Sequence, residues 1–151
     1  MNNSQPRHLF LDRNSLMKFL ILLLLVASSA WAQSTPPLTG TFSNLTYLEE
    51  EGDVTGMEIT IIPSGSAGNY SYHALIQIAE GEPAAPQLVP VNYDGQRLLI
   101  VFNYPGAGGV TFEGKLSGTS LSGNLTGTQF ASTKYVLPRK ASYWQQSARR
   151  K

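Results

Sequence analysis

Residue types that perform acid–base or nucleophilic chemistry are scarce in most of this chain. Beyond residue 32 there is one histidine, His73, on the polar side of a stretch in which polar and apolar residues alternate. A hydrolytic triad needs a base beside its nucleophile, and no Gly-x-Ser-x-Gly motif supplies that nucleophile. We therefore expect His73 to be a surface residue, and we expect that the protein is not an enzyme.

Metal and glycosidase chemistry need clustered ligands or facing acids. The chain has no cysteine, and one histidine is too few for a structural zinc site. The acidic run at 49–53 lacks the alternating ligand spacing of a calcium loop, so we interpret it as a solvated hairpin tip. The other acids fall on expected outer faces or in turns: Glu58, Glu80, Glu82, Asp94 and Glu113. We expect no acid pair in a cleft, no metal and no cofactor.

The charge balance gives no reason to expect a nucleic-acid partner. The whole chain has 11 basic and 10 acidic residues, and residues 33–151 have 8 and 9. Nucleic-acid-binding domains gather Lys and Arg on one face. The one basic cluster in the sequence, Arg149-Arg150-Lys151, is interpreted as a solvated tail.

Residues 1–32 have the three parts of a bacterial export signal. A polar, basic start precedes the apolar run 19–27, and Ala30 and Ala32 stand before Gln33 in the small-residue pattern that signal peptidase cleaves. The apolar run is shorter than the ~20 residues of a membrane span. We expect cleavage after Ala32 and no stable membrane insertion, with an uncleaved anchor as the alternative.

Two details refine this expectation. Met17 and Lys18 directly precede the apolar run, so Met17 is a candidate for the true start of translation. The absence of cysteine excludes both disulfides and lipid attachment at a lipobox. The sequence therefore predicts a periplasmic or secreted protein that is not a lipoprotein.

The remainder of the chain predicts a single all-β domain. We expect a flexible lead-in at 33–39, a domain at 40–140 and a tail at 141–151, in which Ser142 caps a short helix running to Arg150. Short apolar or alternating runs are separated by Gly, Pro, Asn and Asp, which is typical of antiparallel strands and not of helices. The expected strands are 40–48, 54–62, 69–80, 87–93, 97–104, 110–116, 121–126 and 134–137.

These strands favour a small antiparallel up-and-down β-barrel of about eight strands, because closure removes exposed sheet edges. A two-sheet β-sandwich is the alternative. Barrels of this size either fill their interior with side chains or hold one small ligand. The residues that we expect to face the interior, and to contact any ligand there, are Tyr70, Tyr72, Ile76, Phe102 and Phe112. Ordinary core packing of the same residues is the competing interpretation.

The strand expected at 97–104 is apolar on both faces. Leu98, Ile100 and Phe102 alternate with Leu99 and Val101. A second apolar face needs a cover. We consider two: the aromatic tail that contains Tyr143 and Trp144, and a dimer contact through Leu99 and Val101.

Two ends of the domain resemble the calycin group of barrels, the lipocalin-like and avidin-like proteins. Gly40-Thr41-Phe42 opens the first strand, and Arg139 follows the last. The resemblance implies that Phe42 closes the barrel floor and that Arg139 lies across it. Phe42 stands where that group has a tryptophan, and Asn92-Tyr93-Asp94 does not reproduce the second lipocalin signature.

The function expected from these observations is binding without catalysis. The first hypothesis is an exported module for a small apolar ligand or a protein segment, and the alternative is a structural or interaction protein of the cell envelope with a filled core. An enzyme is the third hypothesis, which two acids converging in a cleft would favour. A cavity of ~300 Å³ or more favours a small ligand. A filled barrel with an exposed apolar patch at Leu99 and Val101 favours a protein partner.

Overall fold

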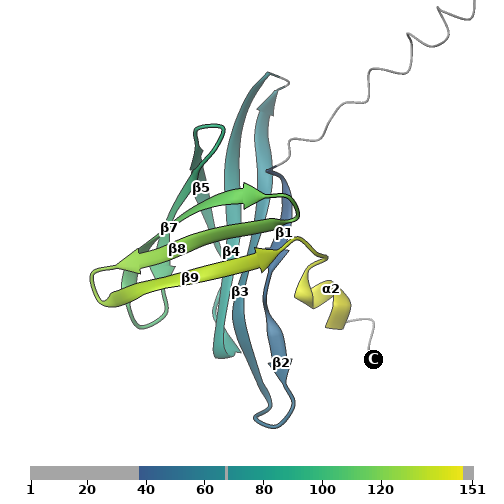
Figure 1. Ribbon diagram of the computed structural model, residues 1–151. Helices are drawn as coiled ribbons and strands as arrows, with labels where there is room; N and C mark the ends of the chain where they lie inside the picture. Colours follow the sequence, from purple (N-terminus) through teal and green to yellow (C-terminus); the bar gives the residue numbers. More distant parts are fainter. Residues whose placement is uncertain (1–37, 67, 148–151) are drawn as a thin grey trace, which may run out of the picture. The chain divides into compact units, whose positions relative to one another are not determined.

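Turn-forming residues divide the chain into strands that follow one another in a single sheet. The computed structural model describes residues 38–66 and 68–147, and it shows one antiparallel sheet nearly closed into a barrel (Figure 1). The elements are β1 (Gly40–Ser43), β2 (Thr46–Leu48), β3 (Asp53–Ser66), β4 (Asn69–Pro83), β5 (Gln87–Tyr93), β6 (Leu98–Tyr104), β7 (Gly108–Ser117), β8 (Ser120–Gly127), β9 (Phe130–Pro138) and the helix α2 (Tyr143–Ser147).

The predicted fold class is confirmed. The sheet order β1-β3-β4-β5-β6-β7-β8-β9 follows the chain, with β2 also pairing with β3. The ladders are antiparallel, and all the strands belong to one sheet, as in an up-and-down barrel, whereas a sandwich has two sheets. The predicted signal peptide and its cleavage site at Ala30, Ala32 and Gln33 lie outside the described residues, as does the lead-in up to residue 37.

The first expected strand, 40–48, is divided in two at Asn44. The Asn44 N–H donates to the Met57 carbonyl oxygen at 3.1 Å, but the Met57 N–H donates to the side-chain Oδ1 of Asn44 at 2.7 Å, so a side-chain oxygen takes the place of the backbone acceptor at this point. Opposite, Gly56 has a φ of 111°, and a Cβ atom there would lie 2.8 Å from the Asn44 carbonyl oxygen. The glycine therefore allows the close approach that separates β1 from β2.

The interior of the barrel is filled by inward-facing side chains of alternating residues. Along β6 the pattern is strict, because Leu98, Ile100, Phe102 and Tyr104 are buried and the residues between them are exposed. These side chains join one apolar cluster with residues from β1, β3, β4 and β7 to β9. Burial of this cluster is the main stabilising contribution to a domain without disulfides.

The position of the Phe112 ring accounts for two glycines, one on β7 and one on β8. Gly114 and Gly123 are register partners, and a Cβ atom on either would lie 2.6–2.7 Å from a carbon of the fully buried Phe112 ring. The ring therefore packs closely against bare backbone at both positions, where a side chain would collide with it.

A narrow seam joins the first and last strands. Phe42 and Arg139 form an isolated antiparallel bridge, and the guanidinium carbon of Arg139 lies 4.5 Å from the centroid of the Phe42 ring. Arg139 also donates to the carbonyl oxygen of Thr39. The two residues that the sequence analysis paired are thus in contact, one with its ring in the core and the other across it.

The tail forms a single turn of helix outside the barrel wall. Glu58 lies on the outer face of β3 and is nevertheless 6% exposed, because it accepts hydrogen bonds from the Ser142 hydroxyl at 2.6 Å and the Tyr143 N–H at 2.8 Å. The first N–H of α2 is therefore satisfied by a distant carboxylate, whereas we expected the Ser142 side chain to cap the helix. No helix within residues 38–66 and 68–147 is long and apolar enough to span a bilayer.

Candidate functional site

The five residues expected to line a ligand cavity separate into two groups. Ile76, Phe102 and Phe112 are buried members of the apolar cluster and pack against other side chains there. Tyr72 is partly buried at the margin of that cluster, and Tyr70 is 44% exposed beyond it. Tyr70 therefore does not lie in the filled interior, because the β4–β5 ladder ends at Tyr72 and only β3 still pairs with Tyr70.

The ladder between β5 and β6 stops at Pro90. At the turn of this hairpin, the Asp94 N–H donates to the Arg97 carbonyl oxygen at 3.2 Å. In an antiparallel ladder, every second residue counted from such a bonded pair directs its N–H and C=O toward the partner strand. On β5 these residues are Asn92 and then Pro90, whose backbone groups face β6. Because proline has no N–H, it cannot donate to Val101, and the paired register ends at Val91 and Ile100.

Gln87 bridges the two strands beyond this break. Its side-chain Nε2 donates to the Asn103 carbonyl oxygen at 2.7 Å, and its Oε1 accepts from the Asn103 N–H at 2.9 Å. The side-chain amide thus provides both bonds that a neighbouring strand would provide. Between this bridge and the last register pair, no strand of the described residues pairs with Val101 on the side of β5.

The ladder between β4 and β5 also ends early. Its last pair is Tyr72 and Val91, although β4 continues to Asn69 and β5 continues to Tyr93. The same alternation directs the backbone N–H and C=O of Tyr70 toward the space that β5 vacates. No strand of the described residues pairs with Tyr70 on that side.

A surface groove of about 490 Å³ occupies this divergence, and we call it the tyrosine groove. The rings of Tyr72 and Tyr93 meet edge to face there, with centroids 6.0 Å apart. Its lining has no charged side chain and consists of Tyr70, Ser71, Tyr72, Pro90, Val91, Asn92, Tyr93, Leu99 and Val101.

Leu99 and Val101 remain uncovered within the described chain. They are 41% and 56% exposed on the outer face of β6. The aromatic tail does not cover them, because Trp144 donates from its indole to Gln77 on β4 and Tyr143 is held by Glu58 on β3. The tail alternative from the sequence is therefore wrong, while the dimer contact stays a prediction.

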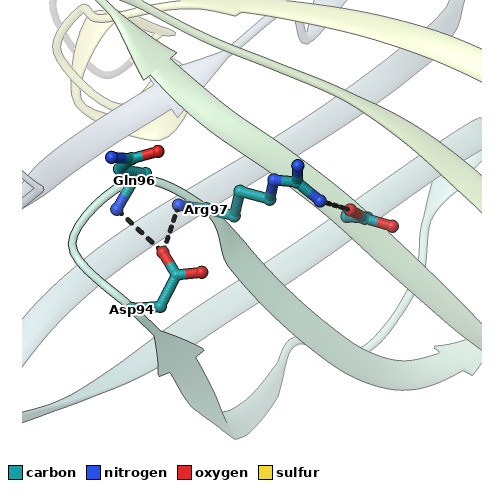
Figure 2. A network of polar contacts seen from close by, with 4 residues as sticks. Asp94, Gln96 and Arg97 are labelled. Carbon is teal, nitrogen blue, oxygen red and sulfur yellow. Dashed lines mark hydrogen bonds and ion pairs between the residues drawn. The ribbon is translucent and has the colours of Figure 1, made fainter.

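A rigid turn sets the position of the β5–β6 hairpin that forms one wall of the groove. The Asp94 carboxylate accepts from the N–H groups of Gln96 and Arg97 at 2.8 and 2.7 Å, as Figure 2 shows. These two backbone hydrogen bonds, that of Arg97 first, hold the pKa of Asp94 below its ordinary value of 3.8. The Tyr93 hydroxyl donates to the Gly95 carbonyl at 2.7 Å, which fixes this ring to the same turn.

The acid–base groups do not assemble into a catalytic arrangement in the part of the chain that the structure describes. His73 lies partly buried on the outer face of β4, in register with Pro90. Glu80 differs from our expectation of an outer-face position, since it follows Ile78 on the inward side at the end of β4 and accepts a hydrogen bond from Tyr104. Burial, and then this bond to Glu80, raise the pKa of Tyr104 well above its ordinary value, so its hydroxyl keeps its proton.

Metal ligands do not gather in the described residues either: no group of three His, Cys, Asp or Glu side chains is placed to hold an ion.

Comparison of the chain with family models, with curated proteins and with solved structures finds no match.

Two of the three groove tyrosines were predicted from the sequence, but the groove itself was not. Alternation identified Tyr70 and Tyr72, whereas Tyr93 gave no signal beyond its place before a turn. Pro90 inside an otherwise regular strand was the available sign that a ladder would break there. The width of the resulting divergence depends on how the strands curve around the barrel, which the pattern of residues does not contain.

Proposed function

We propose that this protein is an exported, non-catalytic binding module whose tyrosine groove receives an extended, uncharged segment of another protein. The observation that carries the proposal is the combination of an uncharged aromatic groove with unpaired strand backbone at its edge. A second candidate ligand, a small apolar molecule, is favoured by the groove volume, which falls within the ~300–1,000 Å³ of small-molecule sites.

The filled interior supports a ligand on the wall of the barrel instead of within it. Ile76, Phe102 and Phe112 have at most 4% exposure and occupy the positions where an internal ligand would lie. Tyr70, Leu99 and Val101 each leave more than a third of their surface in solvent. Exposed apolar and aromatic side chains that are contiguous mark interaction surfaces more often than scattered ones do.

The backbone supports an extended protein segment as the partner. A strand added beside an open edge gains main-chain hydrogen bonds, and the neighbouring pockets select its side chains. Tyr70 directs an N–H and a C=O into the groove, and Val101 directs a carbonyl toward the gap that Pro90 leaves. The absence of charge in the lining favours a segment without Lys, Arg, Asp or Glu, because burying an unpaired charge is unfavourable.

A phage-displayed library of random peptides tests the proposal. We expect uncharged peptides rich in aromatic, branched or proline residues to be enriched on the wild-type protein. Their affinity should fall by about tenfold or more in Val101→Glu, since a buried unpaired charge is worth more than the ~1.4 kcal/mol of a tenfold change. Tyr70→Ala should weaken them as well.

Val136→Glu is the matched control, because Val136 is 51% exposed on β9 and does not line the groove. Peptides that bind all variants equally, or a selection without enrichment, would overturn the proposal. Native mass spectrometry of protein purified from its own compartment tests the second candidate. A retained small molecule that Val101→Glu releases would favour that ligand.

The export signal expected at residues 1–32 supports a site of action outside the cytoplasm. We propose a periplasmic or secreted protein, in which a fold without cysteine needs no oxidative step. Mass mapping of the exported form, with Gln33 expected as its first residue, checks this part of the proposal independently of the groove.

A further inference from the structure

A second hollow lies on the outer face of the barrel, over β7, β8 and β9. It has a volume of about 400 Å³, and we call it the basic hollow. Its polar lining is formed by Arg97, Glu113, Lys115, Ser122, Asn124 and Lys134. None of these residues lines the tyrosine groove, so the two sites do not share a side chain.

The charges of the chain are unevenly distributed toward this hollow. Three of the five Lys and Arg side chains within residues 38–66 and 68–147 line it. Only one of the nine Asp and Glu side chains of the same residues, Glu113, does so. Although acidic side chains outnumber basic ones in the described residues, the hollow itself is a locally positive concavity, which attracts anions.

The strand register places the charged residues of the hollow on neighbouring rows of the sheet. The β6–β7 pairing of Leu98 with Gly114, continued by one residue, sets Arg97 opposite Lys115. Lys134 lies two strands from Glu113 in the same cross-strand row, through Asn124. Directly opposed like charges destabilise a sheet, and an anion bound between them would remove that repulsion.

Arg97 is held in place by its backbone and keeps donors available. The Asp94 carboxylate fixes its N–H (Figure 2). The side chain of Arg97 reaches Glu113, to which its guanidinium donates. The ion pair between Arg97 and Glu113 spans 3.5 Å with side chains 70% and 58% exposed, so it is weak and easily exchanged. A guanidinium has five N–H donors, of which this pair uses one.

We infer that the basic hollow binds a ligand through a phosphate or diphosphate group. An arginine fork and flexible lysine ammonium groups together match the charge and oxygen geometry of phosphates. The Ser122 hydroxyl and the Asn124 amide add neutral hydrogen-bond groups to the lining. This inference does not depend on the tyrosine groove, and either can fail alone.

Titration of the full exported chain with inorganic pyrophosphate, followed by calorimetry and by amide chemical shifts, tests the inference. We expect saturable binding that moves the amides of residues 113–115 and 122–124. The double variant Lys115→Gln, Lys134→Gln should weaken binding by about tenfold or more, since each charge-assisted hydrogen bond contributes strongly. Lys140→Gln, which removes an exposed cation that does not line the hollow, should leave the affinity unchanged.

Two further measurements make the outcome decisive. The double variant should unfold at about the same temperature as the wild type, because Lys115 and Lys134 are exposed and such surface substitutions change stability little, so a loss of binding cannot be attributed to misfolding. Co-sedimentation with phosphatidylcholine vesicles, with and without phosphatidic acid, identifies the source of the phosphate group. If the protein binds both pyrophosphate and the vesicles that contain phosphatidic acid, the ligand is a lipid headgroup. If it binds pyrophosphate but not these vesicles, the ligand is a soluble phosphate. Absence of both kinds of binding, or an equal effect of Lys140→Gln, would overturn the inference.

Discussion

The side-chain amide of Gln87 pairs with both backbone groups of Asn103, donating at 2.7 Å and accepting at 2.9 Å. This pair lies beyond the point where Pro90 ends the regular ladder. It therefore keeps the ends of β5 and β6 together while leaving the wall between them open at Val101. The open stretch is one margin of the tyrosine groove.

Gln87→Ala should loosen this margin. The loss of two hydrogen bonds is expected to lower the free energy of unfolding by about 1–3 kcal/mol, and the Asn103 amide should exchange its hydrogen faster. Urea denaturation and native-state hydrogen exchange measure the two effects. Gln96→Ala is the control, because that side chain is exposed and only its backbone is bonded to Asp94. Equal exchange rates at Asn103 in both variants would contradict the assignment.

Arg139→Met tests the seam between the first and last strands. Methionine keeps an apolar side chain over Phe42 but removes the cation over the ring and the bond to the Thr39 carbonyl. We expect the free energy of unfolding to fall by about 1–3 kcal/mol. Lys140→Met, at the exposed neighbouring position, should change it by no more than ~0.5 kcal/mol. Thermal and urea unfolding that show the two variants to be alike would exclude a stabilising role for Arg139.

Gly123→Ala should be strongly destabilising although alanine is small. Its Cβ atom would lie 2.5 Å from the Glu113 carbonyl oxygen and 2.6 Å from the Phe112 ring, neither of which can move freely. We expect a loss of about 1–3 kcal/mol in the free energy of unfolding. Gly109→Ala provides a matched comparison, because no atom lies within 4 Å of a Cβ there. A stable Gly123→Ala variant would show that the wall can shift at this position.

Glu58→Ala should release α2 from the wall. The variant removes the acceptor for the Ser142 hydroxyl and the Tyr143 N–H, and a single helical turn is unstable without tertiary contacts. Trp144, whose indole donates to Gln77 at 2.6 Å, should then emit at longer wavelength as it becomes more hydrated. Glu82→Ala removes an exposed acid elsewhere and should leave the emission unchanged.

The Asp94 turn should weaken in acid. The pKa of Asp94 is lowered in the folded protein, so its contribution is complete above the unfolded pKa of about 3.8 and is lost as the pH falls through the lower folded value. The N–H signals of Gln96 and Arg97 should shift together with the Asp94 carboxyl carbon, with a common midpoint below 3.8. Asp94→Asn should abolish that titration.

Strand positions were predictable because turns and alternation are local signals. Asp94-Gly95 marked the β5–β6 hairpin, and the alternation from Tyr72 to Ile78 gave the buried face of β4. The division of the first strand was not predictable, since it depends on the Asn44 side chain meeting Met57 from another strand. Local patterns report which residues extend, and they do not report which ladder a side chain interrupts.

The same limit of local sequence patterns applies to the candidate sites. Glu58 was correctly placed on an outer face, but its burial beneath α2 joins residues 84 positions apart. The basic hollow collects Arg97 from the turn before β6, Lys115 from β7 and Lys134 from β9, and no short motif contains more than one of them. Only the register of four consecutive strands brings these cations to one surface.

The order in which the barrel assembles follows from its strand order. All ladders from β3 to β9 join strands that are consecutive in the chain, so each can form as a local hairpin. The bridge between Phe42 and Arg139 instead closes a loop of 97 residues, and it fixes many residues for few new contacts. We expect the seam to form last during folding and to open first under stress, which would leave β1 and β9 as two free edges able to pair with another copy of the chain.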